Sequence, residues 1–162
     1  ILWQTGAINP AQEHFISNLV RQKLIVAIDG QFKKLAENAE KYVLYLPEGE
    51  MHEISLLFAD YIIKSRQQKT IYLGQSLPFV DLEAVYDLHQ PDYLLTVLTS
   101  IPGIAEIQNY VNRLSEKFPD CQILLTGYQV VGQDVETPDN VHILTRMEQL
   151  VEHLEMKTVK TV

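Results

Sequence analysis

The sequence predicts an α/β fold, in which helices cover a parallel sheet on both faces. Short apolar runs rich in β-branched and aromatic residues alternate with helical patterns from residue 42 to residue 156. Such alternation is typical of strand–helix–strand units, whose strands are parallel. Five of these units follow one another, which favours a doubly wound, flavodoxin-like sheet of five strands.

The expected strands are short and mostly apolar, as in strands that are buried on both faces. They cover residues 42–46, 70–74, 92–99, 122–127 and 141–145. Apolar residues recur at helical spacing between and after these strands. This spacing predicts helices at residues 53–66, 79–89, 103–118 and 147–156.

A separate helix is expected before the first strand, at residues 9–29. Asn9 suits the N-cap and Pro10 the first helical position, while Asp29-Gly30 ends the apolar periodicity. The segment "QFKKLAENAEK" then continues as a short helix or a linker. We therefore expect a helical cap, part of a helical bundle, at residues 1–40, followed by the sheet domain at residues 41–162.

Composition narrows the classes of function. The chain has 162 residues, a formal net charge of −8 and a single cysteine, Cys121. An acidic surface repels phosphate backbones, so direct binding of nucleic acid by this chain is not expected. One cysteine excludes an internal disulfide and favours the reducing cytoplasm. No apolar stretch approaches the length of a membrane span, so no membrane partner is expected.

The candidate site starts in "LPEGEMHEISLLF", residues 46–58, where the first strand is expected to end. Ligands of open α/β sheets bind beyond the carboxyl ends of the strands, and His52 is expected at that edge. Glu50 is spaced to hydrogen-bond one ring nitrogen of His52, which leaves the other nitrogen to bind a metal. In the alternative interpretation, His52 is a solvated loop residue, and Glu50 and Glu53 only favour the first turn of the next helix.

Several common site types do not occur in the sequence. The five histidines lack metal-ligand spacing such as His-Glu-x-x-His, so a metal site built from protein ligands alone is not expected. There is no Gly-x-Ser-x-Gly elbow, Gly-rich phosphate loop or dinucleotide fingerprint. A phosphoacceptor receiver domain is set aside, because the third strand carries Thr96, Leu98 and Thr99 where an Asp is needed.

Together, these motifs resemble those of cobalamin-binding domains. The stretch "PEGEMHEIS" is similar to the family's Asp/Glu-x-His-x-x-Gly loop, which implies that His52 ligates cobalt from below, with Glu50 beside it. Thr96-Val97-Leu98 takes the place of the family's Ser-x-Leu on the third strand, and Thr126-Gly127 that of Gly-Gly at the end of the fourth. The resemblance implies that these strand ends and Ser55 surround the nucleotide tail of a corrinoid.

A second signature lies near the N-terminus. Trp3, nine intervening residues and Glu13-His14 resemble the Trp…Glu-His motif in the helical cap of MerR-type cobalamin regulators, the light-sensing CarH and LitR group. In that group, the Trp and the Glu cover the upper face of the corrin and enclose the adenosyl group. The resemblance therefore implies a cofactor like adenosylcobalamin, held by Trp3, Glu13 and His14 above and by His52 below.

Four positions depart from the family pattern. Ser55 replaces a Gly, Thr96 replaces a Ser and Thr126 replaces the first Gly of the pair. These added side-chain atoms narrow the single slot in which the nucleotide tail is expected. Gln4 follows the Trp where the light-sensing group has a His, which argues against a light-triggered mechanism with two His ligands.

We therefore expect the ligand-sensing effector domain of a MerR-type transcriptional regulator, and not an enzyme. Ligand occupancy would alter self-association into a homodimer or tetramer. DNA would be contacted through a domain upstream of Ile1, so the chain is expected to be a fragment. Two alternatives stay open: a degenerate sensor that no longer binds a corrinoid, and a corrinoid carrier module of a methyltransferase.

Overall fold

Residues 9–31 and 34–159 are described in the computed structural model. Their strands form one sheet: β1 (Lys41–Pro47), β2 (Lys69–Leu77), β3 (Tyr93–Val97), β4 (Gln122–Thr126) and β5 (Val141–Ile143). The order across the sheet is β2-β1-β3-β4-β5, and each neighbouring pair is parallel. This is the flavodoxin-like order, so the predicted fold class is confirmed.

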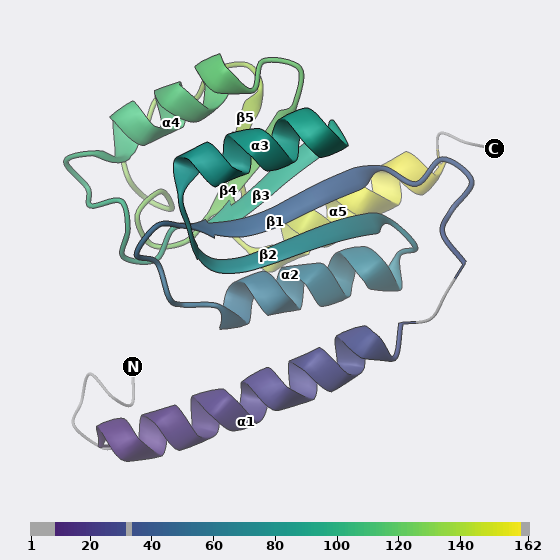
Figure 1. Cartoon of the computed structure of the whole chain (residues 1–162), viewed down its shortest axis with the longest axis vertical. Coiled ribbons are helices and arrows are strands. Elements are labelled where there is room, and N and C mark those ends of the chain that lie inside the picture. The colour runs from purple at the N-terminus through teal and green to yellow at the C-terminus, as the bar shows by residue number, and fades with distance from the viewer. Residues whose placement is uncertain (1–8, 32–33, 160–162) are drawn as a thin grey trace.

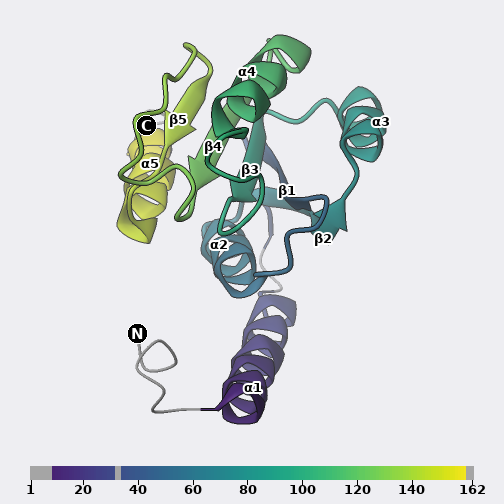
Figure 2. The same cartoon turned by 90° about the vertical axis from the view of Figure 1, so that its left-hand side faces the viewer.

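The helices form layers on the two faces of this sheet. They are α1 (Pro10–Asp29), α2 (Ile54–Ser65), α3 (Phe79–His89), α4 (Ile107–Lys117) and α5 (Met147–Val159). Helices α2 and α5 cover one face, α3 and α4 cover the other, and α1 lies outside α2 as a further layer (Figure 1). Figure 2 shows from the side that α1 is separated from the sheet by α2.

Strand side chains alternate between two hydrophobic cores. Leu95 and Leu124 belong to the core under α2 and α5, whereas Leu94 and Ile123 belong to the core under α3 and α4. Because both faces of the sheet are buried, the strands read as continuous apolar runs rather than as alternating ones. This burial explains why the strands were recognisable in the sequence.

Several segments differ from the sequence-based expectation, and the helix expected at residues 103–118 begins only at Ile107. β2 continues to Leu77, beyond the expected end at residue 74. Within the described part of the linker, residues 34–40 form a turn and no helix. There the backbone N–H of Ala36 donates to Gln67 O (2.9 Å), so this segment is held against the start of β2 instead of coiling on itself.

Helix α1 is capped as the sequence predicts, but it is poorly covered. Asn9 and Gln12 form a reciprocal capping box, with both hydrogen bonds at 3.0 Å. None of the residues of α1 is buried, and Phe15 and Val26 are each about 70% exposed. A helix with apolar residues on several sides is normally surrounded by protein, so α1 has more apolar surface than α2 alone covers.

Candidate functional site

The turn after β1 places Glu50 and His52 at the carboxyl edge of the sheet. Pro47 ends the strand, Gly49 has a φ of +85°, and the Glu50 N–H donates to Pro47 O (2.9 Å). Glycine adopts this φ without strain. The turn directs Glu50 inward, where it is fully buried, and leaves His52 at the surface with 62% of its side chain exposed.

The buried Glu50 carboxylate joins the loop after β1 to the loop after β3. Three consecutive backbone N–H groups donate to Glu50 Oε2, those of Thr99 (3.1 Å), Ser100 (2.6 Å) and Ile101 (3.0 Å). Glu50 Oε1 accepts from the backbone N–H groups of Met51 (2.9 Å) and His52 (3.0 Å). One side chain therefore fixes the relative position of two loops that are far apart in the sequence.

Electrostatics at Glu50 decide which nitrogen of His52 is free. Burial alone would raise the pKa of Glu50, but hydrogen bonds from the Ser100 backbone and from the His52 side chain outweigh it and lower this pKa to about 2. Glu50 Oε1 lies 2.5 Å from His52 Nδ1. A charged carboxylate only accepts hydrogen bonds, so Nδ1 carries a proton and Nε2 is left as a lone-pair donor on an exposed ring.

A cavity of about 610 Å³ lies between α1 and this edge of the sheet. Its lining residues are Glu13, His14, Ser17, Asn18 and Arg21 of α1, together with Met51, His52, Glu53, Ile54, Ser55, Gln75 and Thr99. Four residues named from the sequence, Glu13, His14, His52 and Ser55, thus meet around one space. Sequence reasoning missed Gln75, which donates to Met51 O (2.6 Å), because nothing in its spacing indicates that it supports the His52 loop.

Glu53 has a larger part in the structure than its expected effect on a helix terminus. Its side chain is 7% exposed and forms no cap hydrogen bond with α2. Arg21 of α1 donates to Glu53 Oε2 (2.6 Å), and the hydroxyl of Tyr72 in β2 donates to Glu53 Oε1 (3.0 Å). The hydrogen bond and the charge interaction with Glu53 raise the pKa of Arg21 further, so the guanidinium stays positively charged.

The Thr96 and Thr126 side chains lie on opposite faces of the sheet, and the slot expected for a nucleotide tail stays a prediction. Thr96 alternates with Leu98 and with it faces the core under α3 and α4, whereas Thr126 shares a face with Leu124, under α2 and α5. The Thr126 hydroxyl donates to Leu144 O (2.7 Å). Sequence alone did not fix this, because a shift of one residue moves a strand side chain to the opposite face.

The residues that follow β3 and β4 nevertheless pack closely against each other, in what we call the junction of these two strands. Gly127 has a φ of +108°, and a Cβ there would lie 2.5 Å from Leu98 O. Thr96 Oγ1 is buried and has no hydrogen-bond partner among the described residues. A buried hydroxyl without a partner is costly, and it is the group in this junction that a ligand atom would satisfy.

Some expectations fall on residues beyond the described part of the chain. Trp3 and Gln4 lie outside residues 9–31 and 34–159, so their place relative to the cavity stays a prediction. Within those ranges, no group of three or more His, Cys, Asp or Glu side chains is arranged to hold a metal ion. The helices of the same residues include none long and apolar enough to cross a bilayer.

Comparison with known proteins supports the sequence resemblance. No protein-family model matches the chain. The HTH-type transcriptional repressor CarH of Myxococcus xanthus is 26% identical over 117 residues, which cover 72% of this chain and 38% of that protein. This chain is similar to CarH-type cobalamin-binding domains. The resemblance expected from the motifs is thereby confirmed, although the chain spans less than half the length of the CarH repressor.

Solved structures show the same fold at low sequence identity. The Methanosarcina barkeri monomethylamine corrinoid protein superposes with a TM-score of 0.64 and 12% identity, over 87% of this chain and 66% of its own. A chain of the Methanosarcina barkeri methanol:cobalamin methyltransferase complex gives a TM-score of 0.63 and 14% identity, over 99% of this chain and 62% of its own. A cobalamin-binding protein from Desulfitobacterium hafniense gives a TM-score of 0.53 and 16% identity, over 77% of this chain and 60% of its own. At these identities, the likeness establishes the fold.

Proposed function

We propose that this chain is the cobalamin-sensing effector domain of a MerR-type transcriptional regulator, with His52 as the lower axial ligand of cobalt. The observation that carries the proposal is the His52 ring, which lines the cavity, is largely exposed and has its Nδ1 held by the charged Glu50. An imidazole with one nitrogen fixed by a carboxylate is a well-oriented metal ligand. Similarity to the CarH repressor supports the regulatory context.

The described residues fit the axial side of a corrinoid. When bound, the corrinoid supplies a cobalt centre that needs one donor from the protein below its ring. His52 is that donor, Glu50 holds its tautomer, and Glu13 and His14 on α1 offer polar groups on the opposite wall of the same cavity. A coordinating ring and a facing helix are the surfaces that a large flat cofactor needs.

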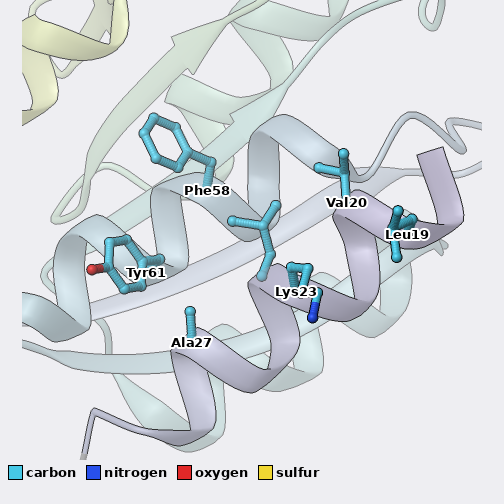
Figure 3. Close-up of a pocket in the computed structure, with 7 residues that line it drawn as sticks. Leu19, Val20, Lys23, Ala27, Phe58 and Tyr61 are labelled. Atoms are coloured by element: carbon cyan, nitrogen blue, oxygen red, sulfur yellow. The ribbon is translucent and has the colours of Figure 1, made fainter. Parts of the chain in front are cut away.

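The domain organisation is part of the same proposal. Residues 1–40 belong to a helical cap, and residues 41–162 form the sheet domain. Helix α1 borders an apolar groove of about 490 Å³, with Leu19, Val20, Lys23 and Ala27 on one side and Phe58 and Tyr61 of α2 on the other (Figure 3). Further helices of the cap would cover this groove, because apolar surface of this kind favours burial.

The regulatory partners are proposed from the CarH similarity. DNA would be bound by a helix-turn-helix segment outside this chain, which spans 38% of the repressor's length. Cobalamin binding would change how copies of the protein associate, into a homodimer or tetramer, in the cytoplasm. A ligand can do this only by binding one assembly state more tightly than the other.

Adenosylcobalamin, added to the purified chain in the dark, tests the proposal through absorbance and thermal unfolding. At a free concentration about 100 times its Kd, the ligand would stabilise the fold by about 2.7 kcal/mol, or roughly 5–10 °C for a chain of this size. The variant His52→Ala is expected to lose most of both signals. His142→Ala is the matched control, since His142 is exposed and bonds to Gln122 Oε1 (2.7 Å) away from the cavity. No change with the unmutated chain would overturn the proposal.

A degenerate sensor is the second candidate, and Thr126 is the observation that favours it. Thr126 stands at a position where the family has Gly, and its hydroxyl donates to Leu144 O at the end of β4. Cobinamide, a corrinoid without the nucleotide tail, separates the cases. We expect cobalamin to bind more tightly than cobinamide; binding of cobinamide alone would mean that the tail is excluded, and binding of neither would favour the degenerate sensor.

A corrinoid carrier of a methyltransferase is the third candidate, because two of the solved structures with this fold belong to corrinoid and methyltransferase systems. A carrier has to present the upper face of its corrinoid to a partner enzyme. Here Glu13 and His14 of α1 stand on that side of the cavity. We therefore expect no methyl transfer from the methylcobalamin-loaded chain to a thiol in the presence of a corrinoid methyltransferase; efficient transfer would favour the carrier.

A further inference from the structure

Glu53 connects three elements at a point directly beside His52. It is the N-cap residue of α2, yet its buried carboxylate does not cap that helix and instead accepts from Arg21 of α1 (2.6 Å) and from Tyr72 of β2 (3.0 Å). The bond from the Arg21 guanidinium to this buried carboxylate has a charged donor, and such bonds are short and strong. Movement of α1 would therefore act on the residue that follows His52.

The His52 loop is held at both ends by carboxylates with different partners. Glu50, on one side of His52, is bonded to the backbone of the loop after β3 and belongs to the rigid sheet edge. Glu53, on the other side, is bonded to Arg21 on a helix that has no buried residue. The bonds of Glu50 hold the His52 ring against the edge of the sheet, and the bond of Glu53 connects the same loop to α1.

Contact between α1 and α2 also involves an apolar surface. An open groove lined by Leu24 and its neighbours lies between the two helices. Apolar contact of this kind is non-directional and allows one helix to slide or tilt on the other. A charge-assisted hydrogen bond has a preferred direction, so the Arg21–Glu53 pair defines where α1 lies along the cavity.

We propose that Arg21 is a positioning residue, which fixes α1 over the His52 loop through Glu53 and so couples closure of the cavity to ligand binding at His52. The identity of the ligand in this inference rests on the proposed function. The coupling of α1 to the His52 loop is independent of which ligand binds. A ligand that contacts both walls of the cavity stabilises the closed arrangement, and that arrangement in turn favours the ligand by the same factor. A ligand that contacts His52 alone gains nothing from Arg21.

The first test needs no ligand. Amide hydrogen exchange is measured for residues 10–29 in the unmutated chain and in Arg21→Met, which removes the charge and the donor but keeps an unbranched apolar side chain. Exchange in α1 is expected to be roughly tenfold faster in the variant, as for the loss of one charge-assisted hydrogen bond, with α4 unchanged. The matched control Arg146→Met removes an exposed ion pair to Glu152 (3.7 Å) and is expected to leave α1 unchanged.

Tyr72→Phe separates positioning from general stability. This variant removes the other bond to Glu53 and leaves the Arg21 bond in place, and we expect it to lower the global stability of the fold. We expect faster unfolding with α1 exchange close to that of the unmutated chain. Equal acceleration of α1 in Tyr72→Phe and Arg21→Met would mean that the Glu53 cluster is only structural, and would overturn the proposal.

The second test compares two corrinoids that differ in the size of the upper ligand. The adenosyl group of adenosylcobalamin would extend toward the wall formed by α1, whereas aquocobalamin has only a water molecule in that position. Arg21→Met is expected to lower the affinity of the chain for adenosylcobalamin by roughly tenfold and its affinity for aquocobalamin by less than twofold. Arg21→Lys is expected to restore part of the lost affinity. Equal effects on both would overturn the coupling, while no binding of either by the unmutated chain would instead refute the proposed function.

Discussion

Replacement of Glu50 by Gln tests whether a buried charge holds the candidate site together. Glu50→Gln keeps the size of the side chain but removes the negative charge that accepts from the loop after β3. The pKa of Glu50 falls from its ordinary value of 4.5 to about 2 in the folded chain. A difference of this size corresponds to roughly 3 kcal/mol of stability at neutral pH, at about 1.36 kcal/mol for each pKa unit.

The pH dependence has a definite sign. Because the folded-state pKa is lowered, the contribution of Glu50 is fully present above pH 4.5 and is lost as the pH falls from there toward 2. The stability gap between the unmutated chain and Glu50→Gln is therefore expected to narrow by roughly 2 kcal/mol between pH 7 and pH 3. The Gln amide adds a cost against the backbone N–H donors, but that cost does not change with pH.

Urea unfolding at a series of pH values measures this gap. Glu48→Gln is the control, since Glu48 is an exposed carboxylate in the same turn, and its stability curve should run parallel to that of the unmutated chain. If the Glu50→Gln curve also runs parallel from pH 7 to pH 3, the charge of Glu50 does not stabilise the loop junction and the reasoning for His52 fails with it.

Two further outcomes follow from backbone geometry and burial. Gly127→Ala is expected to lower the melting temperature clearly and to cost about 1–3 kcal/mol, because the added Cβ would meet Leu98 O and the φ of +108° strains any side chain; an unchanged melting curve would contradict the tight junction. Burial raises the pKa of Cys121 to about 12, so a thiol reagent at pH 8 should label it much faster in denaturant than in the native chain, and equal rates would contradict its burial.

Much of the fold was predictable because its signals are local. Continuous apolar runs mark the doubly buried strands, and Asn9, Pro10 and Gly30 mark the ends of α1. The expected helix at 79–89 coincides with α3, where Pro78 precedes the first turn. Expected boundaries also differ where contacts distant in the sequence determine the structure, as for the linker before β1 and the extension of β2.

The candidate site was only partly predictable, since its main contacts join segments far apart in the sequence. The short spacing from Glu50 to His52 suggested their contact, but nothing local indicated that backbone donors near Ser100 hold the same carboxylate. The partnership of Arg21 with Glu53, across more than thirty residues, likewise has no sequence signal. For Thr96, the face of the sheet depended on the strand register, which one sequence does not fix.

The five backbone donors that hold Glu50 have a thermodynamic consequence for any molecule recognised by His52. A ring already restrained in one orientation loses little rotational freedom when it makes a new bond. Association there should carry a small entropic penalty from the protein, so that differences in affinity among related compounds reflect their own contacts rather than ordering of the loop.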